Sequence, residues 1–265
     1  MRVREALAAA AARLPGETPR LDADLLMAHA LDASREEMLL QHTDAEAPAA
    51  FNALIERRLA HEPVAYITGR KAFWTIELAV GPGVLIPRPD SETLLEAAVA
   101  HFGAGGPGRI LDLGTGPGTL LLAALDQWPG ASGIGVDASE AALAWARRNA
   151  RPRAEFRLGD WGEGLEECFD LVLCNPPYVE ADAVLMPDVA AWEPAAALYA
   201  GADGLDAYRI LVPQLRALLA PGGIACLEVG AGQANAVHAL FAAEGFTIES
   251  RNDLKGVERC LVVTA

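Results

Sequence analysis

The sequence predicts an α/β protein with a mainly parallel sheet, preceded by a small helical bundle. From residue 109 onward, apolar strand-like segments alternate with helical segments, and such alternation requires a parallel sheet covered by helices on both faces. Residues 1 to about 80 lack this alternation and contain several short amphipathic segments instead. We therefore expect a helical N-terminal domain and an α/β domain in one chain.

The N-terminal region is predicted to form four short helices. Apolar residues recur there at helical spacing, with charged residues between them. At the third helix, Ser34 can accept a hydrogen bond from the backbone of Glu37 while the Glu37 carboxylate reaches back, which is a capping box. The expected helices are Val3 to Leu14, Leu21 to Leu31, Ser34 to Leu40, and Ala49 to His61.

A connector follows the helical region. Between about residues 63 and 90, aromatic and β-branched residues are interrupted by glycine and proline, which favours a β-hairpin. Asp90 or Ser91 can cap a helix that runs towards Phe102, and the glycine-rich residues 103–108 mark a flexible join. We place the boundaries at 1–80 for the helical domain, 81–108 for the hairpin and linker, and 109–265 for the α/β domain.

The α/β domain is expected to contain a seven-stranded sheet. Helical segments run through Leu125, from Ser139 to Asn149, near Leu205 to Leu219, and from Ala234 to Ala243. The expected strand segments between and after them are 109–114, 131–137, 154–160, 169–178, 223–230, 246–250 and 259–264.

Composition excludes several classes of protein. Of 265 residues, 52% are hydrophobic, which is ample for a packed core, and the net charge is −15. That charge argues against direct binding of long nucleic acid, which requires clustered Lys and Arg. The acidic surface is either simply solvated or attracts a basic partner. No uncharged apolar window of about 18 residues exists, and the N-terminus is amphipathic rather than signal-like, so we expect no membrane span and a cytoplasmic protein.

The cysteines and histidines predict no metal site. The four cysteines contain no C-x-x-C pair, and the five histidines never approach metal-ligand spacing. Cys174, Cys226 and Cys260 lie in apolar strand-like runs. We expect these three to be buried reduced thiols.

A glycine-rich turn follows the first strand of the α/β domain. Ile110 to Leu113 is the apolar strand, and the next helix begins near Thr119. Glycines between a strand and a helix let the backbone turn sharply and approach a ligand closely. The G-x-G-x-G spacing does not meet the dinucleotide fingerprint, and a turn without a ligand is the alternative. The predicted ligand-binding residues are Gly114, Thr115, Gly116, Pro117 and Gly118.

The next two strands end in acidic residues at the same edge of the sheet. Asp137 can accept two hydrogen bonds from a ribose diol, or it can cap the following helix, although Ser139 is available for capping. Asp160 can accept from an adenine amino group while the Trp161 indole covers the ring. The alternative for Trp161 is a place in the core.

The fourth strand ends in Asn-Pro-Pro-Tyr, the most specific motif in the chain. The Asn175 side-chain oxygen and the Pro176 carbonyl can accept both hydrogens of a planar NH2 group, while Tyr178 closes over its plane. Pro176 and Pro177 fix the backbone, so the acceptors stay preorganised. A planar nitrogen has a delocalised lone pair and attacks a methyl sulfonium poorly, so alignment and selective stabilisation of the transition state must supply the catalysis.

These motifs together resemble the Rossmann-like class I methyltransferases that modify planar nitrogens. Residues 63–92, the loop from Glu193-Pro194 to Gly204-Leu205, and the stretches 228–233 (EVGAGQ) and 251–259 (RNDLKGVER) further resemble the HemK-like release-factor glutamine methyltransferases, or protein-(glutamine-N5) methyltransferases. The resemblance covers nearly the whole chain. It implies a class I methyltransferase domain at 109–265 and an N-terminal helical, partner-binding domain joined to it by a β-hairpin.

The resemblance also implies a reaction and its residues. S-adenosyl-L-methionine would donate a methyl group, leaving S-adenosyl-L-homocysteine, to the glutamine of the Gly-Gly-Gln motif of class I peptide release factors, tuning translation termination. The cofactor would contact the glycine turn, Asp137, Trp161 and Asn175, and also Asp160. The substrate glutamine would be held by the tetrad from Asn175 to Tyr178, with Asn175, Pro176 and Tyr178 as catalytic residues. Arg88 would lie at the interdomain cleft, without a defined role.

Other functions remain open at this stage. The nearest alternatives are glutamine methylation of a ribosomal protein and adenine-N6 methylation of DNA, although the chain has no large basic recognition domain. A catalytically silent nucleotide-binding module and an NAD-dependent reductase are weaker alternatives. The intact tetrad argues against the first, and the second lacks an identifiable proton-donating group.

Overall fold

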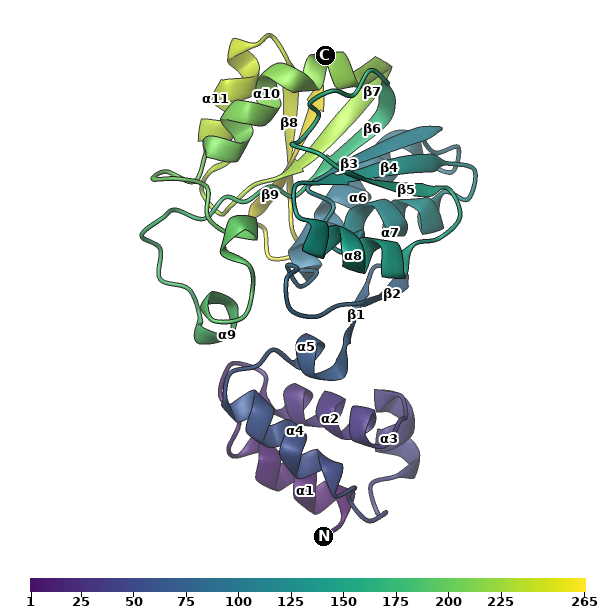
Figure 1. Ribbon diagram of the computed structural model, residues 1–265, viewed down its shortest axis with the longest axis vertical. Helices are drawn as coiled ribbons and strands as arrows, with labels where there is room; N and C mark the ends of the chain where they lie inside the picture. The colour runs from purple at the N-terminus through teal and green to yellow at the C-terminus, as the bar shows by residue number, and fades with distance from the viewer. The chain divides into compact units, whose positions relative to one another are not determined.

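The computed structural model describes residues 1–265, which divide into two units (Figure 1). The helical unit comprises Met1–Arg70 together with Leu185–Trp192. The α/β unit comprises Lys71–Val184 and Glu193–Ala265. The segment Leu185–Trp192 therefore belongs with the N-terminal helices although it lies far from them in the sequence, a grouping that no local sequence pattern reveals.

The helical unit contains the four expected helices with slightly different ends, and one more. The additional helix, α5, has five residues and follows Pro63, and it is too short for hydrophobic periodicity to reveal it. Side chains from several of these helices share one core, including Leu7, Leu26, Met38 and Ile55. The helices are α1 (Val3–Ala11), α2 (Pro19–Ala30), α3 (Arg35–Gln41), α4 (Ala50–Leu59) and α5 (Val64–Thr68).

Only half of the predicted capping box at α3 is present. The Ser34 hydroxyl accepts a hydrogen bond of 3.0 Å from the Glu37 backbone N–H, as expected. The Glu37 carboxylate does not reach back, and instead lies 3.9 Å from the His42 imidazole. The second hydrogen bond of the capping box is therefore absent.

Buried ion pairs join the parts of the helical unit. Arg58 is 7% exposed, and its guanidinium lies 2.8 Å from the Asp22 carboxylate and 3.4 Å from that of Asp188. Asp188 lies in the short helix α9 (Pro187–Ala190). A buried arginine needs such partners because an unpaired charge is costly to desolvate. Arg58 therefore links the distant segment Leu185–Trp192 to α4.

A hairpin lies within residues 63–90, as expected, but it precedes residues 81–108, to which the sequence-based division assigns the hairpin and linker. It is formed by β1 (Arg70–Phe73) and β2 (Ile76–Ala79), which make a two-stranded sheet. Its turn is held to helix α6 (Glu92–Phe102) by the Trp74 backbone N–H, which donates to the Glu92 carboxylate at 2.9 Å. Its second strand is held to helix α8 (Glu140–Asn149) by two hydrogen bonds between Ala79 and the Asn149 side-chain amide, of 2.8 and 3.0 Å. These contacts fix the hairpin to the α/β unit.

The predicted seven-stranded, mainly parallel sheet is confirmed, with strand order β5-β4-β3-β6-β7-β9-β8. Only β9 runs antiparallel, to both β7 and β8. The strands are β3 (Arg109–Leu113), β4 (Ser132–Asp137), β5 (Ala154–Leu158), β6 (Phe169–Cys174), β7 (Leu219–Glu228), β8 (Thr247–Asn252) and β9 (Glu258–Thr264).

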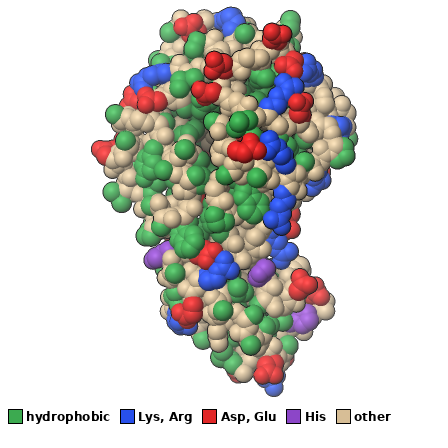
Figure 2. Space-filling model, viewed as in Figure 1, with side chains coloured by type: hydrophobic (Ala, Val, Ile, Leu, Met, Phe, Trp, Pro, Cys, Tyr) green, Lys and Arg blue, Asp and Glu red, His purple; other side chains and the backbone are tan.

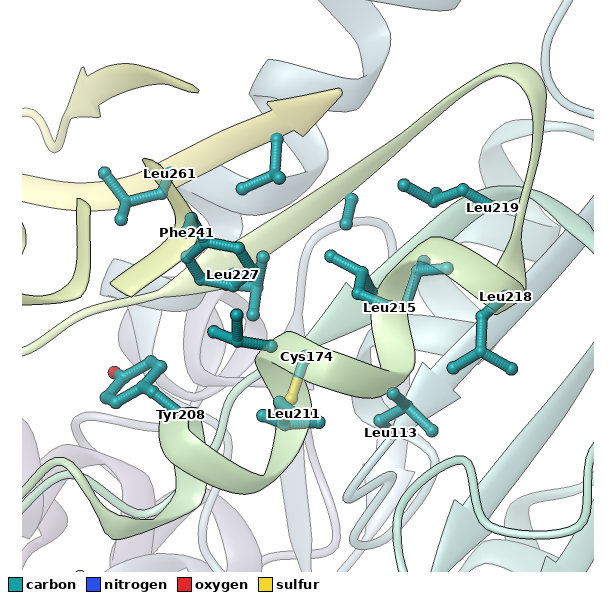
Figure 3. Close-up of a cluster of buried hydrophobic side chains, with 14 of the residues drawn as sticks. Leu113, Cys174, Tyr208, Leu211, Leu215, Leu218, Leu219, Leu227, Phe241 and Leu261 are labelled. Carbon is teal, nitrogen blue, oxygen red and sulfur yellow. The ribbon is translucent and has the colours of Figure 1, made fainter. Parts of the chain in front are cut away.

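Helices cover both faces of this sheet. Figure 1 shows α6, α7 (Thr119–Gln127) and α8 on one face, and α10 (Asp206–Leu218) and α11 (Ala234–Ala243) on the other. The side chains of β3 alternate accordingly. Leu113 joins a buried cluster with Leu211 and Leu215 of α10 (Figure 3), whereas Asp112 faces α7. The buried thiol of Cys174 belongs to the same cluster, and Cys226 and Cys260 are also buried, as expected.

The strand order brings the expected site residues to one edge of the sheet. Strands β4 and β6 flank β3, so that Leu113 pairs with Val136 on one side and with Cys174 on the other. The residues that follow, Gly114, Asp137 and Asn175, therefore leave the sheet side by side. Ligands bind at such a switch point, outside the carboxyl ends of parallel strands.

The surface carries charges of both signs. Figure 2 shows acidic and basic side chains interspersed on the displayed face. Many are paired, as where the Arg209 guanidinium lies 2.8 Å from Asp206 and also contacts Asp203. None of the helices is both long and apolar enough to cross a membrane.

Candidate active site

A cavity of about 290 Å³ opens at the carboxyl edge of the sheet, within the α/β unit. Many of the residues predicted from the sequence line it: Gly114, Gly116, Asp137, Asp160, Trp161, Asn175 and Pro177. The rest of its lining comes from Gly83, Val84 and Leu85, from Val136, Ala138, Ser139 and Ala142, and from Pro194, Ala196 and Ala197.

The glycine turn forms one wall of the cavity. Gly114, Gly116 and Gly118 have positive φ angles of 70°, 56° and 88°, a region that favours glycine. The backbone N–H groups of Gly114 and Thr115 both donate to the Val136 carbonyl, at 2.9 and 3.0 Å. The turn is thereby held against the end of β4.

Three residues of this turn that were predicted to bind a ligand do not line the cavity, and instead contact the residues that support the turn. Thr115 is 3% exposed, and its hydroxyl donates to the Asp112 carboxylate at 2.6 Å. The Pro117 carbonyl accepts from the Asn149 side chain at 3.0 Å. Gly118 precedes α7, where an added Cβ would lie 2.8 Å from the Leu122 side chain.

Asp112 is a buried carboxyl group under the glycine turn. Besides Thr115, it accepts from the Leu121 backbone N–H at 3.2 Å, and its other oxygen has no hydrogen-bond partner. Burial raises the pKa of Asp112 to about 7, although both hydrogen bonds oppose this shift. Asp112 thus ties the turn to the first residues of α7.

Asp137 organises the opposite side of the turn. One of its oxygens accepts from the Gly116 backbone N–H and the other from that of Ser139, both at 2.8 Å. Burial raises the pKa of this carboxyl group, and the two backbone hydrogen bonds oppose the rise. The cap of α8 is Ser139, whose hydroxyl accepts from the Ala142 backbone at 3.2 Å. Asp137 therefore lines the cavity with carboxylate lone pairs that remain available to a hydroxyl donor.

Trp161 packs on the glycine turn. A Cβ added to Gly114 would lie 3.4 Å from the indole ring, so a side chain at that position would crowd the contact. Trp161 has φ of 51°, which is strained for a bulky residue. The next residue is anchored, because the Gly162 N–H donates to the Gln214 side chain at 2.9 Å. Asp160 lies exposed at the rim.

The Asn-Pro-Pro-Tyr tetrad rests on a hydrogen-bonded network. The Asn175 side-chain NH2 donates to the Ser91 hydroxyl at 3.0 Å, and that hydroxyl donates to the Glu228 carboxylate. The Tyr178 hydroxyl donates to the other oxygen of the same carboxylate at 3.1 Å. Pro176 is buried and Asn175 is half-buried, so the tetrad is less exposed than its sequence suggests.

Glu228 sits at the centre of this network and is 1% exposed. Burial raises its pKa to about 6, and the hydrogen bonds from Ser91 and Tyr178 and the charge of Arg259 oppose the rise. Burial and the Glu228 charge together raise the pKa of the Tyr178 phenol. Tyr178 therefore remains a neutral hydrogen-bond donor at physiological pH.

Two lining segments are joined by a buried carboxylate. Glu193, 6% exposed, accepts from the Ile86 backbone N–H at 2.9 Å and forms an ion pair with Arg88. The segment before Arg88 and the segment after Glu193 both line the cavity. Arg88 thus holds together two walls of the cavity.

The sequence pattern predicts no role in the site for Glu193 or Glu228, and for Ser91 it predicts only a helix cap. Ser91 occupies the N-cap position of α6, as expected, but the expected side-chain cap is absent. Ser91 makes no side-chain cap bond, because its hydroxyl binds Glu228, while Asp90 pairs with Arg259 at 3.3 Å. A signal for Glu228 does exist, since a carboxylate at the end of an apolar strand must find a buried partner.

Known proteins resemble this chain over most of its length. Residues 5–69 match the family model described as the PrmC N-terminal domain, and residues 107–229 match one described as a methyltransferase domain. A protein of Rhodospirillum rubrum named release factor glutamine methyltransferase is 48% identical over 257 residues, covering 93% of this chain and 79% of that protein. A protein of the same name from Caulobacter vibrioides is 42% identical, covering 93% of this chain and 89% of that protein.

The chain belongs to the release factor glutamine methyltransferase family. It is therefore a methyltransferase, as its motifs predict. Two solved methyltransferase structures share its fold. A methyltransferase of Pyrococcus furiosus has a TM-score of 0.54 at 21% identity, covering 80% of this chain and 95% of that one. A ribosomal protein L11 methylase of Lactobacillus delbrueckii has a TM-score of 0.52 at 19% identity, covering 70% and 83%.

Proposed function

We propose that this protein transfers a methyl group from S-adenosyl-L-methionine to the side-chain amide nitrogen of the glutamine in the Gly-Gly-Gln motif of class I peptide release factors. The observation that carries the proposal is the orientation of the Asn175 amide. Its NH2 group is bound to Ser91, whereas its oxygen makes no hydrogen bond within the protein. Since Asn175 lines the cavity, this oxygen is the acceptor that a planar NH2 group requires.

The cavity suits an adenosine-containing cofactor. Asp137 offers carboxylate oxygens to a ribose diol, the glycine turn admits close approach of a ligand backbone, and Trp161 offers an aromatic surface. When bound, S-adenosyl-L-methionine supplies an electrophilic methyl group attached to a positively charged sulfur. Of the residues predicted to bind it, Thr115, Pro117 and Gly118 would act through the shape of the turn.

The tetrad suits a glutamine side chain. The Asn175 side-chain oxygen and the Pro176 carbonyl, which also lacks an internal partner, can accept the two amide hydrogens. Tyr178 is held by Glu228 through its hydroxyl and by Gln233, whose side chain donates to the Tyr178 carbonyl at 2.9 Å. These anchors keep the tetrad preorganised, so that binding energy is not spent on ordering it.

The residues of the site align and stabilise rather than abstract a proton. The amide nitrogen would gain a bond to the methyl carbon while the bond between that carbon and sulfur breaks, which would leave S-adenosyl-L-homocysteine. The nitrogen develops positive character on the way and loses one of its two protons to solvent. Carbonyl acceptors bind the amide hydrogens more strongly as that charge develops, which stabilises the transition state selectively. Glu228 is buried beneath Ser91 and Tyr178 and is not part of the cavity lining.

The choice of partner rests on the relatives, which are named for release factors and match nearly the whole chain. The match includes the helical unit, through the family model at residues 5–69. We propose that this unit, residues 1–80 in the sequence-based division, binds the protein substrate, because a free glutamine would not require it.

The test is methylation of a purified, unmethylated class I release factor with methyl-labelled S-adenosyl-L-methionine, followed by peptide mass spectrometry. We expect one added methyl group on the Gly-Gly-Gln glutamine. A release factor whose glutamine is replaced by alanine serves as the control and should take up no label. Label on a ribosomal protein or on DNA, with none on the release factor, would overturn the proposal.

A further inference from the structure

Under the tetrad, hydrogen bonds run in one direction and end on Glu228. Its two carboxylate oxygens accept from two different side chains, the Ser91 hydroxyl and the Tyr178 hydroxyl. The backbone carbonyl of the same residue accepts from the Tyr208 hydroxyl at 2.8 Å. Glu228 is thus fixed at both its side chain and its backbone, and its carboxylate serves only as an acceptor.

Counting protons along this chain fixes the orientation of the Asn175 amide. The Ser91 hydroxyl has one proton and donates it to Glu228, so towards Asn175 it can only accept. It therefore binds the NH2 end of the Asn175 amide. The amide oxygen is left for the cavity. A Ser91 hydroxyl that was free to donate could bind the amide oxygen instead, and would then turn the NH2 group towards the substrate.

We propose that Glu228 and Ser91 are positioning residues that set the hydrogen-bonding polarity of the substrate site. Glu228 makes Ser91 an acceptor, Ser91 orients Asn175, and Asn175 thereby presents an acceptor to the substrate amide. This inference rests on the proposed function, since a polarity suited to an NH2 donor has a purpose only if such a group is the substrate.

The surroundings of Glu228 make this polarity dependent on pH. The charged and titratable groups that face it are Asp90, Arg259, Cys174, Cys260, Tyr178 and Tyr208. The effect of burial outweighs that of the groups that lower the pKa of Glu228, so this pKa is raised to about 6. Protonated Glu228 must donate from one oxygen, which releases Ser91 or Tyr178 from its role as donor. The rate of methyl transfer should therefore fall as pH decreases through about 6.

The first experiment compares Ser91→Ala with Ser91→Thr in single-turnover methylation of the release factor. Ser91→Ala removes the acceptor for Asn175, and we expect the rate to fall about tenfold to 100-fold, as for other losses of preorganised hydrogen bonds. Ser91→Thr keeps a hydroxyl and should restore most of that rate. Affinity for S-adenosyl-L-methionine, measured by calorimetry, should change much less than the rate in both variants, because neither alters the glycine turn, Asp137 or Trp161, which make most of the expected cofactor contacts.

The second experiment replaces the Glu228 carboxylate with a neutral amide. Glu228→Gln should lower the rate to a similar extent and abolish the acid limb near pH 6, since an amide does not titrate. Glu249→Gln, in an exposed position of β8 in the same sheet, is the matched control and should keep the wild-type pH profile. In substrate-free protein, the side-chain NH2 signals of Asn175 in nuclear magnetic resonance spectra should shift with an apparent pKa near 6, and should not do so in Glu228→Gln.

The outcomes separate the two proposals. A wild-type protein that binds the cofactor but methylates no release factor would overturn the proposed function. Active wild-type protein with equal rates in Ser91→Ala and Ser91→Thr would overturn the positioning role alone. If thermal unfolding shows that Glu228→Gln does not fold, other measurements replace it as a test. The comparison of Ser91→Ala with Ser91→Thr and the pH titration of the Asn175 signals in wild-type protein then test the positioning role.

Discussion

Asp112 and Glu228 are both buried carboxyl groups near the carboxyl ends of sheet strands, yet their partners differ in distance along the chain. Asp112 binds Thr115 and the backbone of Leu121, three and nine residues away. Glu228 binds Ser91 and Tyr178, 137 and 50 residues away. The glycine-turn side of the cavity is therefore organised by neighbouring sequence, whereas the tetrad side depends on the complete tertiary fold.

The difference also concerns what each carboxyl group supports. Asp112 holds a turn whose shape follows from its glycines, so it adds stability to a structure that the local sequence already favours. Glu228 determines which end of an amide faces the cavity, and no local rule would set that orientation. Loss of Asp112 should therefore act on stability, and disruption of the Glu228 network should act on the rate of reaction.

The largest expected effect is that of Asn175→Ala, at the end of the Glu228 network. Removing the acceptor for the substrate amide should lower the single-turnover rate by about 1000-fold, or about 4 kcal/mol, because an interaction specific to the transition state is lost. Rapid-quench measurements of labelled methyl transfer test this. A fall of less than about tenfold would show that the tetrad does not hold the reacting nitrogen.

An intermediate effect is expected for Asp112→Asn, which removes titration under the glycine turn. Since the pKa of Asp112 is raised to about 7 in the folded protein, its protonation favours the folded state. Its stabilising contribution is full below about pH 4 and is lost as pH rises through about 7. The free energy of unfolding of wild type relative to Asp112→Asn should thus rise on the order of 2–3 kcal/mol from pH 7 to pH 4.

Urea unfolding of both proteins across this pH range measures that difference. The wild-type protein alone is not informative, because other carboxylates titrate in the same range. A difference that stays constant with pH would contradict the raised pKa and would place Asp112 among ordinary ionised carboxylates.

The smallest expected effect is that of Thr115→Val, which keeps the shape of the side chain and removes the short-range partner of Asp112. The loss of this hydrogen bond should lower the free energy of unfolding by about 1 kcal/mol, and the rate of methyl transfer should change less than about threefold. A rate loss as large as that of Ser91→Ala would remove the contrast between the two sides of the cavity.

The parts of the molecule that the sequence predicts well are those governed by neighbouring residues. The strands, the helices of the α/β unit, the glycine turn and the Ser139 cap all follow from periodicity and turn chemistry within about ten residues. The strand order then brings Gly114, Asp137 and Asn175 together, and parallel topology makes that predictable as well.

The parts that were missed depend on distant contacts. Ser91 has the local signature of a helix cap, but Glu228 takes its hydroxyl. Glu37 has the signature of a capping box, but His42 lies near its carboxylate instead. In each case the choice of partner depends on which groups the fold brings close, and an isolated segment does not contain that information.

The ion pair between Arg58 and Asp188 has a consequence for modular exchange between relatives. The family model for the N-terminal domain ends at residue 69, which invites a graft or deletion at that point. Yet the segment Leu185–Trp192 packs as part of the helical unit. Removing residues 1–70 would therefore leave Asp188 without its partner Arg58, and would leave this segment, which follows the tetrad in the sequence, without the helices against which it packs. A successful chimera must transplant the two stretches together, as a discontinuous module.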